Sequence, residues 1–434
     1  MEPGLVTALV IASVLVLLFL GAPIFLALGF SGLLGIFLLR GITAIFQIPG
    51  AILGQVDSFV LVAVPLFILM GQVLFVTGIG RDLYEFLSRW LYRLPGGLAV
   101  ASIYACAIFG AMCGVSIAAV ATIGVFAIPE MLRRGYDKPF AAGSVTAAGA
   151  LAMLIPPSLL FIIYGEMARV SVGKLFIGGI VPGVILATFM AIYVMARAIK
   201  NPALAPQEFR YVTWRERIAP LKKLWSAVLL ITMVLGTIYT GIATPTEAAA
   251  MGAVGAFLIA IFVYRAINLE TLKEILFAST RTTGAIMIIL ACAMAFSNYL
   301  AFVRVPDMIC AWAAGLAIPT IGTLLIFMLI LVVLGMFVDA VSVIIITTPI
   351  ILPAVMALGF DPLWYGIILV INLEMAVITP PVGLNLYTLK SITEAVNMEE
   401  ILKGTMPYVA LEFAALVFFI LMPELIMWLP STMG

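Results

Sequence analysis

Long apolar stretches separated by short polar turns run from one end of the chain to the other. Stretches of the length that crosses a bilayer, about 17–25 residues, recur throughout the 434 residues. They predict crossing helices near 5–20, 24–39, 58–78, 139–166, 175–196, 224–242, 244–264, 282–300, 362–389 and 406–429. The hydropathy pattern therefore indicates an all-α polytopic membrane protein with about 10 crossing helices.

Two further apolar segments, 97–130 and 318–356, do not fit single crossings. Each is interrupted near its middle, at Cys113-Gly114-Val115-Ser116 in the first and at 336–342 in the second. We interpret both as re-entrant hairpins, because non-helical backbone at membrane depth must be satisfied by protein or water. Amphipathic patterns at 81–94 and 269–276 predict two short helices on the membrane surface.

Basic residues indicate the orientation. Seven of them fall in the polar stretch 197–223, which should be cytoplasmic because Lys and Arg mark the inner side. Five predicted crossings precede this linker and five follow it, so both termini are expected on the periplasmic side. The same map puts 18 of the 22 basic residues inside. They include Arg81, Arg89 and Arg93 before the first hairpin, and Arg133, Arg134 and Lys138 after it.

Composition removes several classes of chemistry. The chain is 65% hydrophobic and 10% charged, whereas soluble domains have about 45–50% and about 25%. It has no histidine, which excludes imidazole relays, haem ligation and the common zinc sites. It has no G-x-x-x-x-G-K-[ST] sequence and no C-x-x-C pair. Work done here must be driven from outside the chain, most simply by an ion gradient, and no nucleic-acid partner is expected.

An internal repeat becomes visible at an offset of 224 residues. This shift aligns Pro129 with Pro353, Gly135 with Gly359, Asp137 with Asp361, Leu160 with Leu384, and Pro156-Pro157 with Pro380-Pro381. The turn 132–138 is basic, but its counterpart 357–363 contains no Lys or Arg. Equivalent turns should therefore lie on opposite sides of the membrane, which predicts an inverted repeat with halves 1–196 and 224–434 joined by the linker 197–223.

A Pro-Pro pair interrupts one predicted crossing in each half, within 139–166 and 362–389. Two prolines remove two backbone donors and leave carbonyls of the preceding turn unpaired. Such carbonyls can coordinate a cation, while the N-termini of the half-helices favour an anion. A single pair could be a plain kink, but paired breaks in related spans point to a binding site for a cation and an acid.

Polar residues gather beside these breaks. Ser116, Thr146 and Ser158 lie in the first half, and Asp339, Ser342, Asn372, Thr379 and Asn385 lie in the second. Hydroxyls in membrane helices often bond only to the backbone or to a neighbouring helix. Asp339 is the stronger candidate because a carboxylate at depth is costly. Glu374 and Glu247 meet the same criterion, although each could simply tie helices together.

The chain resembles the large membrane subunit of the tripartite ATP-independent periplasmic (TRAP) transporters. The matching segments are 64–71, 154–158, 243–250, 335–339, and Asn372-Leu373-Glu374 running into 378–386. Cys113 departs from the small residue expected at the first hairpin tip. The resemblance implies sodium-driven import of an organic acid, such as a C4-dicarboxylate or a sugar acid like sialic acid, across the bacterial inner membrane. It also implies an elevator motion, in which the hairpins and broken helices form a transport domain and the outer spans a scaffold.

The resemblance also implies the ligands. Co-transported sodium ions would bind near Gly114, Ser116 and Gly149 in one half, and near Asp339, Asn372, Thr379 and Gly383 in the other. The substrate would contact Ser116, Ser158, Asp339, Thr379 and Asn385. The implied partners are a periplasmic substrate-binding protein and a small membrane subunit of about four helices. A stand-alone cation-coupled symporter or a channel remains the alternative, and no reactive constellation indicates an enzyme.

Overall fold

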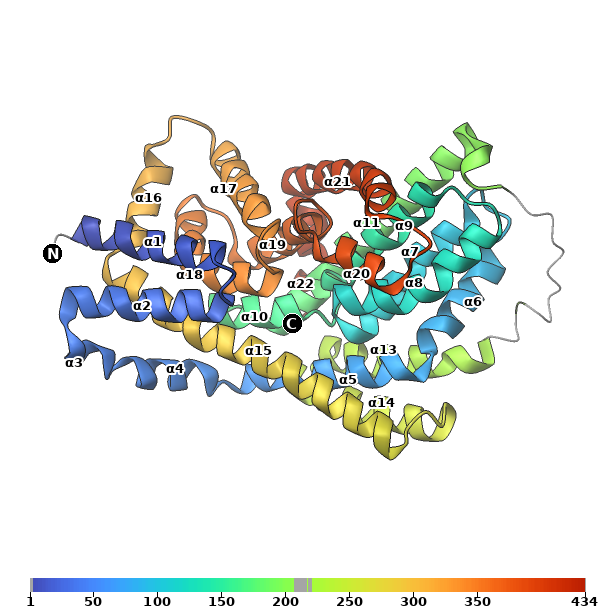
Figure 1. The fold of residues 1–434 in the computed structure, drawn as a ribbon, viewed down its shortest axis with the longest axis horizontal. Coiled ribbons are helices and arrows are strands. Elements are labelled where there is room, and N and C mark those ends of the chain that lie inside the picture. Colours follow the sequence, from blue (N-terminus) through green and yellow to red (C-terminus); the bar gives the residue numbers. More distant parts are fainter. Residues whose placement is uncertain (1–2, 207–216, 218–220, 434) are drawn as a thin grey trace.

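A computed structural model describes residues 3–206, 217 and 221–433, and these residues form helices and turns with no strand (Figure 1). The predicted all-α fold is confirmed. Seven helices in the described part of the chain are long and apolar enough to cross a membrane. The two predicted broken crossings do not count among them, because each is divided into shorter pieces. Arg210 and Arg215 of the basic linker lie outside the described residues.

The first half contains one helical hairpin and one broken helix. Its hairpin consists of α7 (Gly97–Cys113) and α8 (Ser116–Arg133), and its broken helix of α9 (Lys138–Ala150), the short 3-10 turn η2 (Leu151–Met153) and α10 (Leu159–Ala168). The other elements are α1 (Pro3–Phe19), α2 (Ile24–Arg40), α3 (Ile42–Ile45), α4 (Ile48–Val56), η1 (Phe59–Val62), α5 (Ala63–Thr77), α6 (Ile79–Leu91), α11 (Val172–Lys200) and η3 (Pro202–Leu204).

The second half repeats this order. Its hairpin consists of α17 (Thr320–Gly335) and α18 (Ala340–Ala357), and its broken helix of α19 (Pro362–Val377) and α20 (Leu384–Ile392). The other elements are α13 (Leu221–Tyr239), α14 (Pro245–Leu258), the π-helical η4 (Ile259–Val263), α15 (Leu269–Phe302), α16 (Val305–Gly315), α21 (Met398–Leu421) and α22 (Pro423–Ser431).

Equivalent helices begin at the offset found in the sequence. Ser116 and Ala340 begin α8 and α18, and Lys138 and Pro362 begin α9 and α19. The preceding aspartates cap α9 and α19 in the same way, because Asp137 accepts from the Phe140 amide and Asp361 from the Leu363 and Trp364 amides. The recurrence therefore extends from sequence to local structure. The inverted relation of the two halves stays a prediction.

Two expectations about helix boundaries are wrong. Residues 269–276 do not form a separate surface helix, because no proline or glycine interrupts 277–283 and α15 continues for 34 residues. At 1.5 Å per residue α15 is about 51 Å long, more than a bilayer core of about 30 Å. The predicted last crossing at 406–429 ends earlier, since α21 stops at Leu421 and Pro423 starts α22. The helix predicted at 81–94 is present as α6, and its location on the membrane surface stays a prediction.

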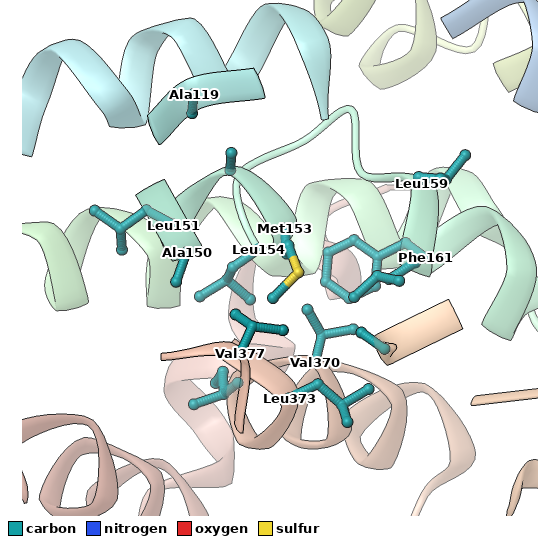
Figure 2. Close-up of a cluster of buried hydrophobic side chains, with 14 of the residues drawn as sticks. Ala119, Ala150, Leu151, Met153, Leu154, Leu159, Phe161, Val370, Leu373 and Val377 are labelled. Carbon is teal, nitrogen blue, oxygen red and sulfur yellow. The ribbon is translucent and has the colours of Figure 1, made fainter. Parts of the chain in front are cut away.

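Two groups of contacting helices can be followed in the fold, and they touch each other where α15 packs on α18 and α5 packs on α7. In one group, α15 runs beside α2, α4 and α5, and α14 lies against α5 (Figure 1). A Cβ at Gly32 of α2 would lie 2.6 Å from the Phe296 amide nitrogen, so glycine permits this close approach to α15. The other group contains the hairpins, the broken helices, α11 and α21. Its core includes the first break, where Met153 and Leu154 face Val370, Leu373 and Val377 of α19 (Figure 2).

Candidate functional site

Each Pro-Pro pair ends one helix and precedes another. In the first half, η2 ends at Met153 and α10 begins at Leu159; in the second, α19 ends at Val377 and α20 begins at Leu384. Both prolyl bonds, Pro156-Pro157 and Pro380-Pro381, are cis. Proline has no amide hydrogen, so neither segment can continue the helical ladder. The predicted breaks are therefore present, with carbonyl groups and helix N-termini on either side.

The tip of the first hairpin lies against the first break. Gly114 ends α7 with a φ of 65°, and a Cβ there would lie 2.3 Å from the carbonyl oxygen of Pro157. One helix further on, a Cβ at Gly149 would lie 2.1 Å from Val120 Cγ2, which brings α9 close to α8. Gly114 and Gly149, the two first-half glycines predicted to adjoin a sodium ion, thus lie where the hairpin and the broken helix meet.

Ser116 connects the two halves of the chain. Its hydroxyl hydrogen-bonds to the side-chain oxygen of Asn385, 269 residues away at the start of α20. The side-chain nitrogen of Asn385 in turn donates to the carbonyl of Thr146 in α9, at 3.3 Å. All three residues are buried. The structure therefore brings together one polar residue from the first hairpin and one from each broken helix.

Three helix N-termini at the tips and breaks have no side-chain cap. Val115, Ser158 and Gly383 precede α8, α10 and α20, and none of them accepts a capping hydrogen bond. The first N–H groups of a helix have no partner within the helix, and its dipole is positive there. These starts can therefore bind a carboxylate.

The hydroxyls of Ser158 and Thr379 are turned to the backbone. Ser158 donates to the carbonyl of Met153, and Thr379 donates to the carbonyl of Met375 at 2.5 Å. Both side chains are buried. The Ser158 hydroxyl satisfies a carbonyl whose helical partner would be Pro157, which has no amide hydrogen, whereas the Met375 carbonyl also accepts from the Ile378 amide at 3.4 Å.

The tip of the second hairpin is capped by its own carboxylate. Asp339 precedes α18, and its carboxylate accepts from the Ser342 amide at 3.0 Å and the Ser342 hydroxyl at 2.5 Å. The carbonyl of Met336 at this tip accepts from the Val382 amide at 3.3 Å, next to Gly383 in the second break. Asp339 is half-buried. Its capping role was not apparent from the sequence, and its role as a ligand stays a prediction.

Two candidates lie away from the tips. The side chain of Asn372 donates to the carbonyl of Met328, in the middle of α17, at 3.1 Å. The structure therefore does not bring Asn372 to the tip of the second hairpin. Glu247 is part of a capping box with Thr244 and stabilises the start of its own helix, α14.

Two buried carboxyl groups lie on neighbouring helices beside the first break. Glu374 of α19 and Glu412 of α21 are fully buried, and none of their oxygens has a well-aligned hydrogen bond with a described residue. The two groups are close enough to interact electrostatically, and the backbone of Leu154 lies within hydrogen-bonding reach of Glu374. Sequence reasoning had not selected Glu412. Its signal was an acidic residue deep inside the apolar stretch 406–429, whose other acidic residue, Glu424, lies near the end of the stretch.

The sequence comparisons with known proteins all match one family of membrane proteins. Residues 11–425 match the family model described as "Tripartite ATP-independent periplasmic transporter, DctM component". The C4-dicarboxylate TRAP transporter large permease protein DctM of Pseudomonas aeruginosa is 37% identical over 410 residues, covering 94% of each chain. The isethionate TRAP transporter permease protein DctMQ of Oleidesulfovibrio alaskensis is 36% identical over 95% of this chain and 64% of its own length.

A solved structure has a similar fold. The YdaH transporter of Alcanivorax borkumensis matches with a TM-score of 0.61 over 89% of this chain and 90% of that one, at 14% sequence identity. At this identity the likeness bears on fold alone. It agrees with the all-helical fold. The family model and the relatives cover nearly the whole sequence. The chain therefore belongs to the DctM family, the large membrane component of tripartite ATP-independent periplasmic transporters.

Proposed function

We propose that this chain couples the inward movement of sodium ions to the uptake of an organic acid, which a periplasmic substrate-binding protein delivers. The observation that carries the proposal is the meeting of three polar residues, Ser116, Asn385 and Thr146, from the first hairpin and both broken helices. Uncapped helix starts beside them favour a carboxylate, and the carbonyls of the breaks favour a cation.

The substrate class follows from the relatives. Their names specify a C4-dicarboxylate and isethionate, both small organic anions. The family is tripartite and this chain corresponds to one component. We therefore infer two partners, a periplasmic binding protein and a small membrane subunit of about four helices. We also infer that this chain lies in the bacterial inner membrane with both of its termini on the periplasmic side.

Reconstitution tests the coupling. The chain is placed in liposomes with its two partners, without ATP, and an inward sodium gradient is imposed in the presence of labelled organic acids. We expect accumulation that stops when potassium replaces sodium. Equal accumulation in both salts, for every acid tested, would refute sodium coupling. Uptake that persists without the binding protein would favour a stand-alone symporter, and currents far above carrier turnover would favour a channel.

The proposed elevator motion can be tested with one introduced cysteine. A Cβ at Gly71 of α5, in the proposed scaffold, would lie 3.2 Å from Cys113 Cβ at the end of α7, close to the usual Cβ separation of about 3.5–4.5 Å in a disulfide. Oxidised Gly71→Cys should therefore lose uptake, and reduction should restore it. Gly71→Cys combined with Cys113→Ala is the matched control. Full uptake by the cross-linked protein would show that these elements do not move apart.

A further inference from the structure

A cavity of about 390 Å³ lies between α6 and the far end of α8, away from the Pro-Pro breaks. Figure 1 shows α6 beside α7 and α8 at one end of the molecule. The charged residues that line the cavity are Arg81, Glu85, Arg89, Glu130, Arg133 and Arg134. The basic residues belong to two clusters that the sequence places on the cytoplasmic side. The tertiary structure brings both clusters to one cavity.

The charges of this cavity are not balanced. Among the described lining residues, four arginines face two carboxylates, so this part of the lining carries two net positive charges. Glu85 pairs with Arg89, while Glu130 pairs with both Arg133 and Arg134 at 2.6 Å. Arg81 forms no ion pair with a described residue, and its guanidinium carbon lies 5.9 Å from the centre of the Phe126 ring. The cavity is therefore suited to an anion.

A buried hydroxyl gives a second, independent indication of a ligand. Tyr84 lines the cavity and is 5% exposed, and its hydroxyl has no well-aligned hydrogen-bond partner among the described residues. The Ser102 hydroxyl lies beside it but donates its own proton to the Leu98 carbonyl at 2.9 Å. Burial and, to a smaller extent, the Glu130 carboxylate raise the pKa of Tyr84 well above its ordinary value. The hydroxyl thus stays protonated and can donate to an oxygen of a bound anion.

We propose that this cavity binds the phosphate group of an anionic phospholipid from the cytoplasmic leaflet. Trp90 of α6 and Val125 of α8 are exposed apolar residues, and each is next in sequence to a residue that lines the cavity. Acyl chains can lie against such side chains, whereas a soluble phosphate would gain nothing from them. The cytoplasmic leaflet is also the one that carries anionic lipids. A lipid bound here would connect the surface helix α6 to the first hairpin.

Lipid binding to the full-length chain tests this proposal, and its readout does not depend on transport. Thermal stability is measured in detergent while phosphatidylglycerol, phosphatidylcholine or glycerol 3-phosphate is titrated in. We expect only phosphatidylglycerol to stabilise the wild type. Arg81→Gln/Tyr84→Phe should weaken its apparent affinity by about tenfold, because a charge-assisted hydrogen bond is lost.

Two controls keep the result decisive. Lys273→Gln removes an exposed cation of α15 outside the cavity, and it should bind phosphatidylglycerol like the wild type. Arg81→Gln alone changes an exposed side chain, so it carries the test if the double variant does not fold. Equal phosphatidylglycerol affinity in Arg81→Gln and the wild type would overturn the site. Equal stabilisation by glycerol 3-phosphate would overturn the lipid as its ligand.

Discussion

Replacing Gly114 with alanine adds a methyl group where the first hairpin meets the first Pro-Pro break. Gly114 has a φ of 65°, a left-handed conformation that costs an alanine about 1–2 kcal/mol. The new Cβ would also lie 2.3 Å from the Pro157 carbonyl oxygen, where 3.4–4 Å is an ordinary contact. The nearest atoms belong to the backbone of Pro157 and Leu159 and cannot rotate away. The hairpin tip must therefore move by about 1 Å, and such overpacking costs a further ~1–3 kcal/mol.

The matched control is Gly359→Ala. Gly359 has a φ of 90° but nothing within 4 Å of its Cβ position, so alanine there incurs only the conformational cost. We expect Gly114→Ala to lower the melting temperature more than Gly359→Ala and to abolish sodium-dependent uptake in proteoliposomes. Gly359→Ala should retain uptake. If the two variants matched in both melting temperature and uptake, the hairpin tip would not lie against the break as described.

Three further substitutions separate ligand roles from structural ones. Asp339→Asn keeps a good N-cap but removes the charge; it should melt like the wild type and lose sodium-dependent uptake, and normal uptake would mean that Asp339 only caps α18. Asn385→Ala breaks the links to Ser116 and Thr146; uptake should be lost while the free energy of unfolding falls by about 1–3 kcal/mol. Gly404→Ala would place a Cβ 1.8 Å from the Pro139 carbonyl oxygen and should lower the melting temperature strongly, whereas Gly284→Ala, in open space on α15, should raise it slightly. Equal melting temperatures for these two glycine variants would contradict the close packing of α9 and α21.

Local features were predictable because their causes are local. A run of apolar residues determines a membrane helix wherever it packs, and proline lacks an amide hydrogen in any context. The breaks at Pro156-Pro157 and Pro380-Pro381 and the caps at Asp137 and Asp361 therefore lie at the positions expected from the repeat. The length of α15 was misjudged, since a change from amphipathic to apolar pattern resembles a helix boundary when no breaker residue is present.

The sequence by itself determined that this chain is an all-helical membrane protein with two related breaks, and its motifs identified the TRAP resemblance. Only the tertiary structure decided which side chains meet. Ser116 and Asn385 are 269 residues apart, and Glu374 adjoins Glu412, while Asn372 packs against the middle of α17. Such pairings depend on how whole helices pack, because a helix fixes the face of a residue but not the neighbour that this face will contact.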